Sequence, residues 1–427
     1  MVAENNEKYE SISFSLSELE NQLRAHGFLE ESISTASEAG KVSLVVENGE
    51  LVALSLRYCA LKALPDALAR FTHLQRLDVS GNQLTSLPPW LGGLVQLKQL
   101  YLDNNQLTTL PMWLESLTQL EELHVDANVL TALPANIGQL AHLKTLRLYN
   151  NQLTALPASI GQLTELKDLS LGNNRLRELP QSLWHLTRLQ SLNLAENQFA
   201  SLPEELGELT GLRMLDLGHN QLTGVPASLA QLTQLSSFLY LHDNHLTSLP
   251  ESLFEKLSNL TYLNLTDNQL QSLPESIGNL VQLRELRLYN NQLTALPKSL
   301  GLLENLSELH IMNNRLASLP NSLGKLTHLK ELDTSNNRLA ALPESLSDLV
   351  NLARLNLRNN RLLVLPGSFA RLASLTHLDL RANRLVSLPE DIGDLAKIEK
   401  LDLRWNKLYV LPEAFQKLER RNCVVLV

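Results

Sequence analysis

The sequence predicts an α/β solenoid with a parallel sheet of about sixteen strands on one face and short helical or 3-10 turns on the other. One observation is the frame L-x-x-L-x-L-x-x-N-x-L-x-x-L-P, which repeats along most of the 427 residues. The other is its asparagine, which returns every 23 residues with two steps of 24. It occurs at Asn82, Asn105, Asn128, Asn151, Asn174, Asn197, Asn220, Asn244, Asn268, Asn291, Asn314, Asn337, Asn360, Asn383 and Asn406. Such a period indicates stacked repeats that bury their apolar faces against one another.

Each repeat is expected to supply one strand, one turn and one outer segment. In L-x-x-L-x-L the leucines at alternate positions point inward and the residues between them point out. The asparagine amide has two donors and an acceptor, enough to bind the turning backbone of its own and the adjacent repeat. The L-P pair that follows begins the outer segment. Strands are narrower than outer segments, so we expect them on the concave side.

The repeats begin at Leu51, and Cys59 takes the asparagine slot of the first one, which gives sixteen repeats with the fifteen asparagines. Thr334 replaces a core leucine, so its buried hydroxyl needs a hydrogen-bond partner. The segment SSFLYLHDN has one extra residue, and we expect a β-bulge around Phe238 and Leu239. The next repeat has its extra residue in LPESLFEKL, where the outer segment can absorb it.

The two ends of the chain differ from the repeats. The segment Ser15–Glu18 is a capping box that predicts a helix. KVSLVVENGELVALSL predicts a hairpin with a type I turn and a left-handed Gly49, which would cover the first repeat. The expected organisation is a disordered N-terminus (1–14), a helix-plus-hairpin N-terminal cap (15–50), the solenoid (51–417) and a C-terminal capping strand (418–427).

Composition limits the class of protein. The net charge of −9 and the pI of about 5.7 argue against a general nucleic-acid binder, which needs a basic footprint. No apolar run approaches membrane-spanning length. The two cysteines lie near opposite ends, so a disulfide framework is not expected. The N-terminus shows no signal peptide. We therefore expect a cytoplasmic protein, a monomer with neither a nucleic-acid nor a membrane partner.

Aromatic and histidine side chains gather at the outward strand positions. They are the candidate partner-binding residues Tyr101, His124, Tyr149, Tyr240, His242, Tyr262, Tyr289 and His310. Tyrosine is favoured at protein interfaces because it offers contact area at a low entropic cost. Two interpretations stay open, a protein-binding surface centred on the middle repeats or the ordinary preference of strands for tyrosine.

Charge changes along the chain. Early repeats present Asp78, Asp103, Glu122, Asp126 and Asp168, whereas late repeats present the further partner-binding candidates Arg354, Arg358, Arg381, Arg404 and Trp405. Just after the asparagine, glutamine gives way to Arg315, Arg338, Arg361, Arg384 and Lys407. Stacked cations about 5 Å apart repel one another. Either a partner with an acidic patch relieves this repulsion, or Asp333, Asp379 and Asp402 in the adjacent column neutralise much of the positive charge.

The sequence shows no motif of an enzyme, a metal site or a cofactor site. It has no phosphate-binding loop, kinase set, nucleophile elbow, H-E-x-x-H or C-x-x-C. Cys59 lies in a structural slot, and no general base is evident near Cys423. We therefore predict a protein without catalytic activity and without a cofactor.

The repeats NQLTALPASIGQLTELKDLSLGNN and NNQLTALPKSLGLLENLSELHIMNN resemble the intracellular leucine-rich-repeat proteins with 23-residue L-P units. This family includes the Ras-regulating scaffolds, the plant intracellular Ras-group proteins and many bacterial repeat proteins. The resemblance covers about residues 51–417 and implies a horseshoe whose concave face binds other proteins. It therefore implies a signalling scaffold. The alternative is a bacterial effector that binds and modulates a host signalling protein, which would require an export signal in residues 1–14.

Overall fold

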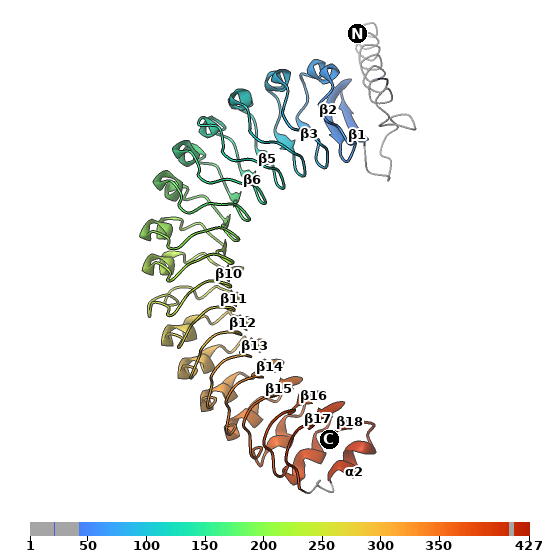
Figure 1. Ribbon diagram of the computed structural model, residues 1–427, viewed down its shortest axis with the longest axis vertical. Coiled ribbons are helices and arrows are strands. Elements are labelled where there is room, and N and C mark those ends of the chain that lie inside the picture. The colour runs from blue at the N-terminus through green and yellow to red at the C-terminus, as the bar shows by residue number, and fades with distance from the viewer. Residues whose placement is uncertain (1–20, 22–41, 410–413) are drawn as a thin grey trace. The chain divides into compact units, whose positions relative to one another are not determined.

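The computed structural model describes residue 21, residues 42–409 and residues 414–427. The chain forms two compact units, residues 1–198 (unit 1) and residues 199–427 (unit 2). In each unit the strands lie side by side on one face and the 3-10 turns line the opposite face (Figure 1). Among the described residues, no helix has the length and apolar character needed to cross a membrane.

Unit 1 contains an antiparallel hairpin followed by the early repeats. Its strands are β1 (Val42–Glu47), β2 (Glu50–Leu56), β3 (Arg76–Asp78), β4 (Gln99–Tyr101), β5 (Glu122–His124), β6 (Thr145–Arg147), β7 (Asp168–Ser170) and β8 (Ser191–Asn193). Its 3-10 turns are η1 (Asp66–Arg70), η2 (Pro89–Gly93), η3 (Met112–Ser116), η4 (Ile137–Gln139), η5 (Ala158–Gln162) and η6 (Gln181–His185).

Unit 2 contains the later repeats and ends in a short α-helix and a strand. Its strands are β9 (Met214–Asp216), β10 (Phe238–Tyr240), β11 (Tyr262–Asn264), β12 (Glu285–Arg287), β13 (Glu308–His310), β14 (Glu331–Asp333), β15 (Arg354–Asn356), β16 (His377–Asp379), β17 (Lys400–Asp402) and β18 (Val424–Leu426). Its helical elements are η7 (Glu204–Glu208), η8 (Ala227–Gln231), η9 (Glu275–Asn279), η10 (Lys298–Leu302), η11 (Asn321–Lys325), η12 (Glu344–Asp348), η13 (Phe369–Arg371), η14 (Glu390–Asp394) and α2 (Ala414–Glu419).

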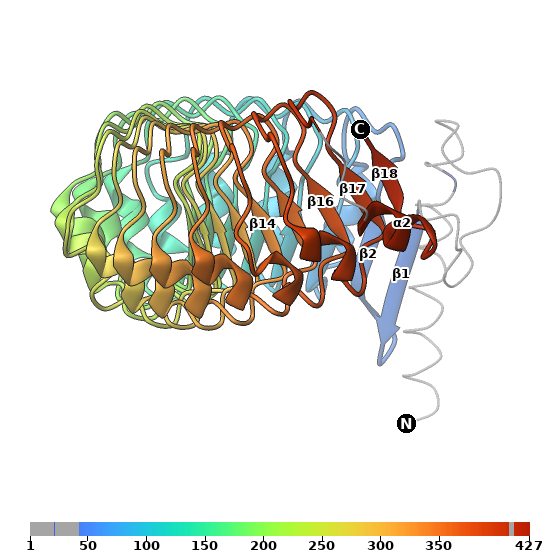
Figure 2. The ribbon, with the colours of Figure 1, turned by 90° about the horizontal axis from the view of Figure 1, so that it is seen from below.

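Successive repeats pair as parallel strands in a constant register. Leu100 in β4, for example, lies opposite Leu77 in β3 and Leu123 in β5. These central leucines are fully buried, and the residues on either side of them face the open surface. The regular spacing of the strands is visible in Figure 2. The predicted fold class, a parallel-sheet solenoid with short turns on the outer side, is confirmed.

The L-P pair starts each outer turn because proline fixes the extended backbone that enters it. Pro111 has φ −74° and ψ 154°, and its carbonyl accepts the N–H of Leu114 at 3.1 Å. The Leu114 carbonyl in turn accepts the N–H of Leu117, also at 3.1 Å. Both leucines are buried, so the 3-10 turn places two apolar side chains per repeat against the core.

The repeating asparagine binds backbone in two repeats, as predicted. Asn105 Nδ2 donates to the carbonyls of Leu102 in its own repeat (3.0 Å) and Val79 in the preceding repeat (3.1 Å). The Leu84 N–H of the preceding repeat donates to Asn105 Oδ1 at 3.0 Å. The same set of bonds recurs at the other buried asparagines, for example Asn314. Each amide therefore ties two adjacent turns together.

The residue before this asparagine adopts a left-handed backbone conformation. Asn150 (φ 56°) and Asn290 (φ 56°) are typical, since asparagine tolerates this region better than most residues. The first and last repeats place an aromatic residue in this slot, Tyr58 with φ 56° and Trp405 with φ 64°. A bulky side chain is unfavourable there, so the fold itself gives no reason for a tryptophan at this position.

The hairpin forms where the sequence predicts it, but its turn differs. Leu44 in β1 lies opposite Leu54 in β2, and the register shifts by one residue between Val45 and Val46. Asn48 (φ 52°) and Gly49 (φ 83°) both have positive φ. The prediction of a type I turn with only Gly49 left-handed is therefore wrong. An Asn-Gly pair with two positive φ values matches the twist of a two-residue hairpin better.

The predicted bulge around Phe238 and Leu239 is also wrong. Phe238 pairs with Met214 in β9 and with Tyr262 in β11, and no residue within β10 is unpaired. The extra residue is instead accommodated before the strand, at Ser236 and Ser237. Thr261 Oγ1 donates to the carbonyls of both serines, at 2.9 and 2.8 Å. The lengthened segment before β10 is therefore bound to the next repeat, and β10 itself keeps its register.

The two unusual core residues find partners. Thr334 is fully buried, and its hydroxyl donates to the Asn356 carbonyl at 3.4 Å. The Cys59 N–H donates to Asn82 Oδ1 at 3.0 Å, and its thiol donates to the Arg57 carbonyl at 3.5 Å. The following repeat therefore supplies a hydrogen-bond acceptor for the backbone N–H of Cys59.

At the C-terminal end, β18 pairs in parallel with β17 and continues the sheet of unit 2. Helix α2 takes the place of a 3-10 turn and packs against η14. The capping box Ser15–Glu18 and the predicted disordered segment 1–14 lie outside the described residues. The rest of the expected N-terminal cap before the hairpin also lies outside them, apart from residue 21, which is helical.

Candidate protein-interaction surface

The exposed surface of the sheet, here called the strand face, is formed by the first and third residues of each strand and by the residue two positions after it. Alternation in a strand sends these side chains to the side opposite the buried leucines. Nothing in the repeat frame fixes their identity, because they do not pack in the core. Their chemistry is therefore where function can vary between repeats.

In unit 2 the strand face carries an aromatic cluster, defined as Phe238, Tyr240, His242 and Tyr262 together with His219, which precedes Asn220 and lies beside them. Phe238 and Tyr240 stack, with ring centroids 4.4 Å apart and an interplanar angle of 14°. Tyr240 also makes edge contacts with Tyr262 at 5.3 Å and His242 at 5.7 Å. His219 and His242 meet edge to face at 4.7 Å. Such contacts hold the rings in place, so little side-chain freedom remains to be lost when a partner binds.

A charged pair borders the aromatic cluster. Arg287 lies over the Tyr262 ring at 5.5 Å, and its Nε donates to Glu285 at 2.5 Å. Burial raises the pKa of Tyr262 to about 12, against the opposing effect of the Arg287 charge. The phenol therefore stays protonated at neutral pH and can donate a hydrogen bond to a partner.

Tyr289 and His310 lie on the strand face beyond the cluster, and both are partly buried. His310 Nε2 is 3.3 Å from Glu308 Oε2. Ligand atoms of Glu285, Glu308 and His310 all lie within 4.8 Å of one another, close enough to hold a metal ion. Glu285 is already bound by Arg287, however, so the arrangement favours an ion-pair network on the surface.

In unit 1 the structure brings together Tyr101 and His124, whose rings meet edge to face at 4.7 Å. Tyr101 donates to Glu122 at 2.6 Å, and Arg76 lies over its ring at 4.9 Å. Burial, followed by the hydrogen bond to Glu122, raises the pKa of Tyr101 to about 12. Burial lowers the pKa of His124, which favours a neutral imidazole at this position.

The early acidic residues bind backbone of the following repeat. Asp103 Oδ1 accepts the N–H of Asp126 at 2.8 Å, and Asp126 Oδ1 accepts the N–H of Tyr149 at 2.6 Å. Burial, then the nearby Asp103 charge, raises the pKa of Asp126 to about 6. The Tyr149 phenol donates to Glu196 at 3.0 Å, away from the Tyr101–His124 pair. These aspartates therefore have a structural role.

Most of the predicted arginines at the late repeats are paired with carboxylates. Arg354 contacts Glu331 at 3.2 Å and Arg404 contacts Asp402 at 2.7 Å. Arg381 contacts Asp379 at 2.5 Å and Asp402 at 3.5 Å. Burial alone would raise the pKa of Asp402, but its hydrogen bond to Arg404 lowers it.

Two predicted residues at this end remain accessible. Arg358 is exposed, and Trp405 is 63% exposed with Arg404 5.6 Å from its ring centre. Internal pairing therefore accounts for much of the positive charge on the late strand face.

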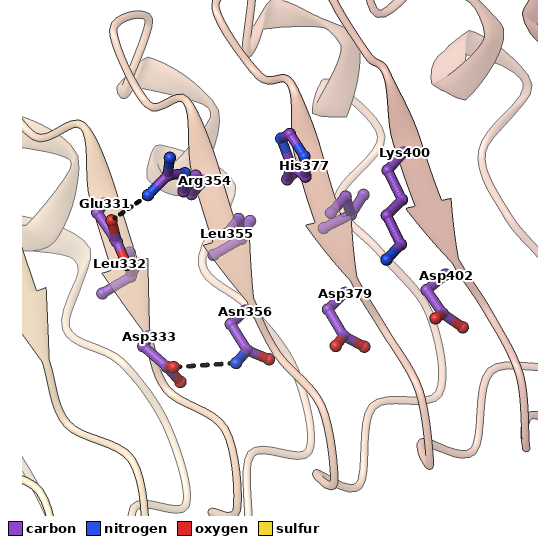
Figure 3. Close-up of a pocket in the computed structure, with 11 residues that line it drawn as sticks. Glu331, Leu332, Asp333, Arg354, Leu355, Asn356, His377, Asp379, Lys400 and Asp402 are labelled. Atoms are coloured by element: carbon purple, nitrogen blue, oxygen red, sulfur yellow. Dashed lines mark hydrogen bonds and ion pairs between the residues drawn. The ribbon is translucent and has the colours of Figure 1, made fainter. Parts of the chain in front are cut away.

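Strands β14 to β17 line an open hollow of about 240 Å³ on the strand face (Figure 3). Its polar lining consists of Glu331, Asp333, Arg354, Asn356, His377, Asp379, Lys400 and Asp402. Glu331 bonds to Arg354, and Asn356 donates to Asp333 at 2.9 Å. Mixed charges and amides of this kind can recognise polar groups of a partner.

Sequence reasoning found part of this surface. The predicted binding residues Tyr240, His242 and Tyr262 come together in the structure, where Tyr240 contacts the other two. Phe238 was predicted only as part of a bulge. Its position as the first residue of a regular strand would have identified it. Arg287 was missed because nothing in a single repeat shows that it lies over a ring of its neighbour. His219 was not among the predicted binding residues.

The comparisons agree with this architecture. Models described as leucine-rich repeat region match residues 126–197 and 239–360, and models described as leucine rich repeat match residues 49–107, 72–130, 188–239 and 351–408. A solved leucine-rich-repeat protein of Leptospira interrogans is 38% identical, with a TM-score of 0.80, over 87% of this chain and 94% of that chain. No curated protein matches the sequence.

Two similar structures are complexes with other proteins or peptides. The ectodomain of the Arabidopsis thaliana receptor kinase GASSHO1/SCHENGEN3, in complex with CASPARIAN STRIP INTEGRITY FACTOR 2, is 33% identical over 88% of this chain and 48% of that chain, with a TM-score of 0.63. The Drosophila Toll–Spatzle complex is 27% identical over 81% of this chain and 49% of that chain, with a TM-score of 0.72.

The repeat models span most of the sequence, and the Leptospira structure is similar over nearly its whole length. Repeats of this kind generally mediate protein–protein interactions and are typically not enzymes. The chain belongs to the leucine-rich-repeat family.

Proposed function

We propose that this protein is a non-enzymatic interaction scaffold that binds another protein through its strand face, with the aromatic cluster of unit 2 at the centre of the contact. The observation that carries this proposal is the contact between Tyr240 and three other rings of the cluster on one open surface. The repeat frame is satisfied without them, since the equivalent positions of β8 hold Ser191 and Asn193.

Interface energetics support this choice. Tyrosine and arginine are enriched among the few residues that supply most of the binding free energy. The cluster combines fixed rings with the Tyr262 phenol and the neighbouring Arg287, so it offers both apolar area and hydrogen-bond donors. Similar structures that hold a peptide or protein ligand add support for a macromolecular partner.

Charge gives a second, weaker indication about the partner. The exposed Arg358 suits a partner with an acidic patch beside its contact for the aromatic cluster. Because exposed charges are screened by salt, this part of the interaction should weaken as ionic strength rises. We further propose that the protein acts as a monomer in the cytoplasm.

The test is site-specific crosslinking. A photoreactive phenylalanine analogue replaces Tyr240 in one variant and Gln269, an exposed residue off the strand face, in a control. The proposal expects one defined protein adduct from position 240, identified by mass spectrometry and absent from position 269. Adducts that are equally abundant at the two positions would contradict a partner-binding strand face.

A further inference from the structure

A second surface lies on the turn edge of unit 2, just after the repeating asparagine. There, five consecutive repeats place a cation in the same slot, forming a basic column of Arg315, Arg338, Arg361, Arg384 and Lys407. All five side chains are exposed. The same slot in early repeats of unit 1 holds Gln83, Gln106 and Gln152, so the frame does not require a cation there.

The basic column lacks internal neutralisation. In contrast to Arg381 and Arg404 on the strand face, none of its five members forms an ion pair with a carboxylate within the described segments. The edge segments 313–319, 336–342, 358–364, 381–387 and 404–409 contain no Asp or Glu. Five cations at a spacing of roughly 5 Å therefore remain uncompensated along the edge.

An apolar column runs beside the last three cations. Leu363, Val386 and Tyr409 lie two residues after Arg361, Arg384 and Lys407, and successive members are linked by backbone hydrogen bonds of 3.2 and 3.5 Å. The intervening Leu362 and Leu385 are buried, so the cations and the apolar residues point outward together. Leu363 is 52% exposed and Tyr409 is 83% exposed. Early repeats have Thr85, Thr108 and Thr131 in this slot.

Trp405 adds a further exposed apolar side chain, two residues before Lys407, whereas Tyr409 lies two residues after it. It is 63% exposed and keeps a left-handed φ of 64° in a slot that asparagine fills in many other repeats. Backbone strain at an exposed aromatic residue points to a use for that side chain outside the fold. Exposed leucine, tyrosine and tryptophan beside unpaired cations now define one surface, here called the basic–apolar edge.

We propose that the basic–apolar edge binds the surface of an anionic lipid bilayer. Lipid headgroups supply a continuous sheet of negative charge that a linear column of cations can meet without any change of register. Tryptophan and tyrosine are favoured at the boundary between headgroups and hydrocarbon, and short aliphatic side chains can enter that boundary.

An exposed column of cations and apolar side chains outside the hollow suits a flat bilayer better than it suits an acidic peptide. A peptide gains most where a groove buries its apolar side chains. The hollow of unit 2 lies on the strand face, and its lining includes none of the edge residues. The expectation of no membrane partner came from the lack of a spanning segment, which attachment to a membrane surface does not need.

The experiment is vesicle flotation with the full-length protein. The probes are vesicles of phosphatidylcholine alone and vesicles that also contain phosphatidylserine. The charge variant carries Arg361→Gln and Arg384→Gln, the apolar variant carries Leu363→Thr and Tyr409→Thr, and the control carries Arg175→Gln in the same slot of unit 1. All introduce residues that other repeats already hold in these slots, so the fold should tolerate them.

We expect binding to anionic vesicles only. Each cation near such a surface raises the membrane partition coefficient roughly five-fold, so the charge variant, which lacks two cations, should bind about 25-fold more weakly. The apolar variant should also bind more weakly, whereas Arg175→Gln should bind like the wild type. Trp405→Asn should weaken vesicle binding yet leave the midpoint of urea unfolding unchanged or higher, a combination that a purely structural tryptophan would not give.

Three results would overturn the proposal. The first is equal binding to neutral and anionic vesicles, and the second is unaltered binding by both the charge and the apolar variants. The third is a glutamate-rich peptide that binds the edge while neither kind of vesicle does, which would assign the surface to an acidic protein. Substitution of Tyr240 and Tyr262 by serine should leave vesicle binding intact, so this test is independent of the strand-face partner.

Discussion

Phe238 stacks on Tyr240 two residues along the same strand, with ring centroids 4.4 Å apart and planes 14° from parallel. Both side chains leave the sheet on its open side, and both are only partly buried. A stack of this kind presents a rigid apolar surface, which Met214 in β9 and Tyr262 in β11 flank on either side. The stack lies in a fully regular β10, and the extra residue of this repeat is accommodated before that strand.

Replacing Phe238 with serine should weaken binding of the strand-face partner by about ten-fold, because an aromatic contact of this kind contributes about 0.5–1.5 kcal/mol beyond its buried area. Stability should change by less than about 1 kcal/mol, since the ring packs on the surface. Calorimetry with the crosslinked partner, once purified, measures the binding. Thr145→Ser, the same strand position in unit 1, is the control. Unchanged affinity for Phe238→Ser would remove this ring from the interface.

Asn105→Ala should destabilise the protein by about 2–4 kcal/mol, because it leaves a buried N–H and two buried carbonyls without their partner. Urea unfolding followed by circular dichroism measures the change. Gln106→Ala alters the next, exposed residue and should have little effect. If the two variants unfolded at the same urea concentration, the structural role assigned to the asparagines would be wrong.

Thr334→Leu should stabilise the protein by about 1 kcal/mol. The threonine hydroxyl is fully buried with one long hydrogen bond of 3.4 Å, whereas leucine would add apolar contacts in a slot that leucine fills in most repeats. Thermal unfolding is measured for Thr334→Leu and for Thr334→Val, which keeps the shape of threonine. The comparison separates the effect of losing the hydroxyl from the effect of adding apolar contacts. A lower unfolding temperature for both variants would show that the hydroxyl stabilises this repeat.

Asp126→Asn should raise stability at pH 7 by about 1 kcal/mol, because its carboxylate is partly buried beside Asp103. The pKa of Asp126 is raised in the folded state to about 6, so its protonated form stabilises the protein at low pH and that contribution is lost as pH rises from about 4 to 6. The variant should lack this loss while its amide oxygen still accepts the Tyr149 N–H.

Urea unfolding of Asp126→Asn and wild-type protein across this pH range is the measurement. Glu178→Gln removes an exposed carboxylate of the same unit and serves as the control. Parallel stability profiles for wild type and Asp126→Asn would contradict the effect of burial on this carboxyl group.

The fold was predictable because a strict sequence period requires every repeat to adopt the same backbone conformation. The inward leucines, the turn asparagines and the L-P pair each have one physical role, and each is seen in the structure. Local irregularities were harder to predict. The extra residue in SSFLYLHDN could lie anywhere between two fixed leucines, and the structure places it before the strand, where the Thr261 hydroxyl of the next repeat binds the carbonyls of Ser236 and Ser237.

The surface was only partly predictable for a related reason. Alternation shows that Tyr240 and Tyr262 face the same side, so their contact follows from the strand register. Pairing between long side chains does not follow from position alone. Arg381, for example, turns back onto Asp379 within its own strand segment, which reduces the positive charge that the sequence appeared to offer a partner.

The most direct test of the central claim compares two double variants in binding to the partner that is crosslinked from position 240. The account predicts that Tyr240→Ser with Tyr262→Ser lowers the affinity at least ten-fold at unchanged stability. Arg361→Gln with Arg384→Gln, on the basic–apolar edge, should leave it unchanged. Full affinity in the tyrosine variant would contradict the assignment of the strand face of unit 2 as the protein-binding surface.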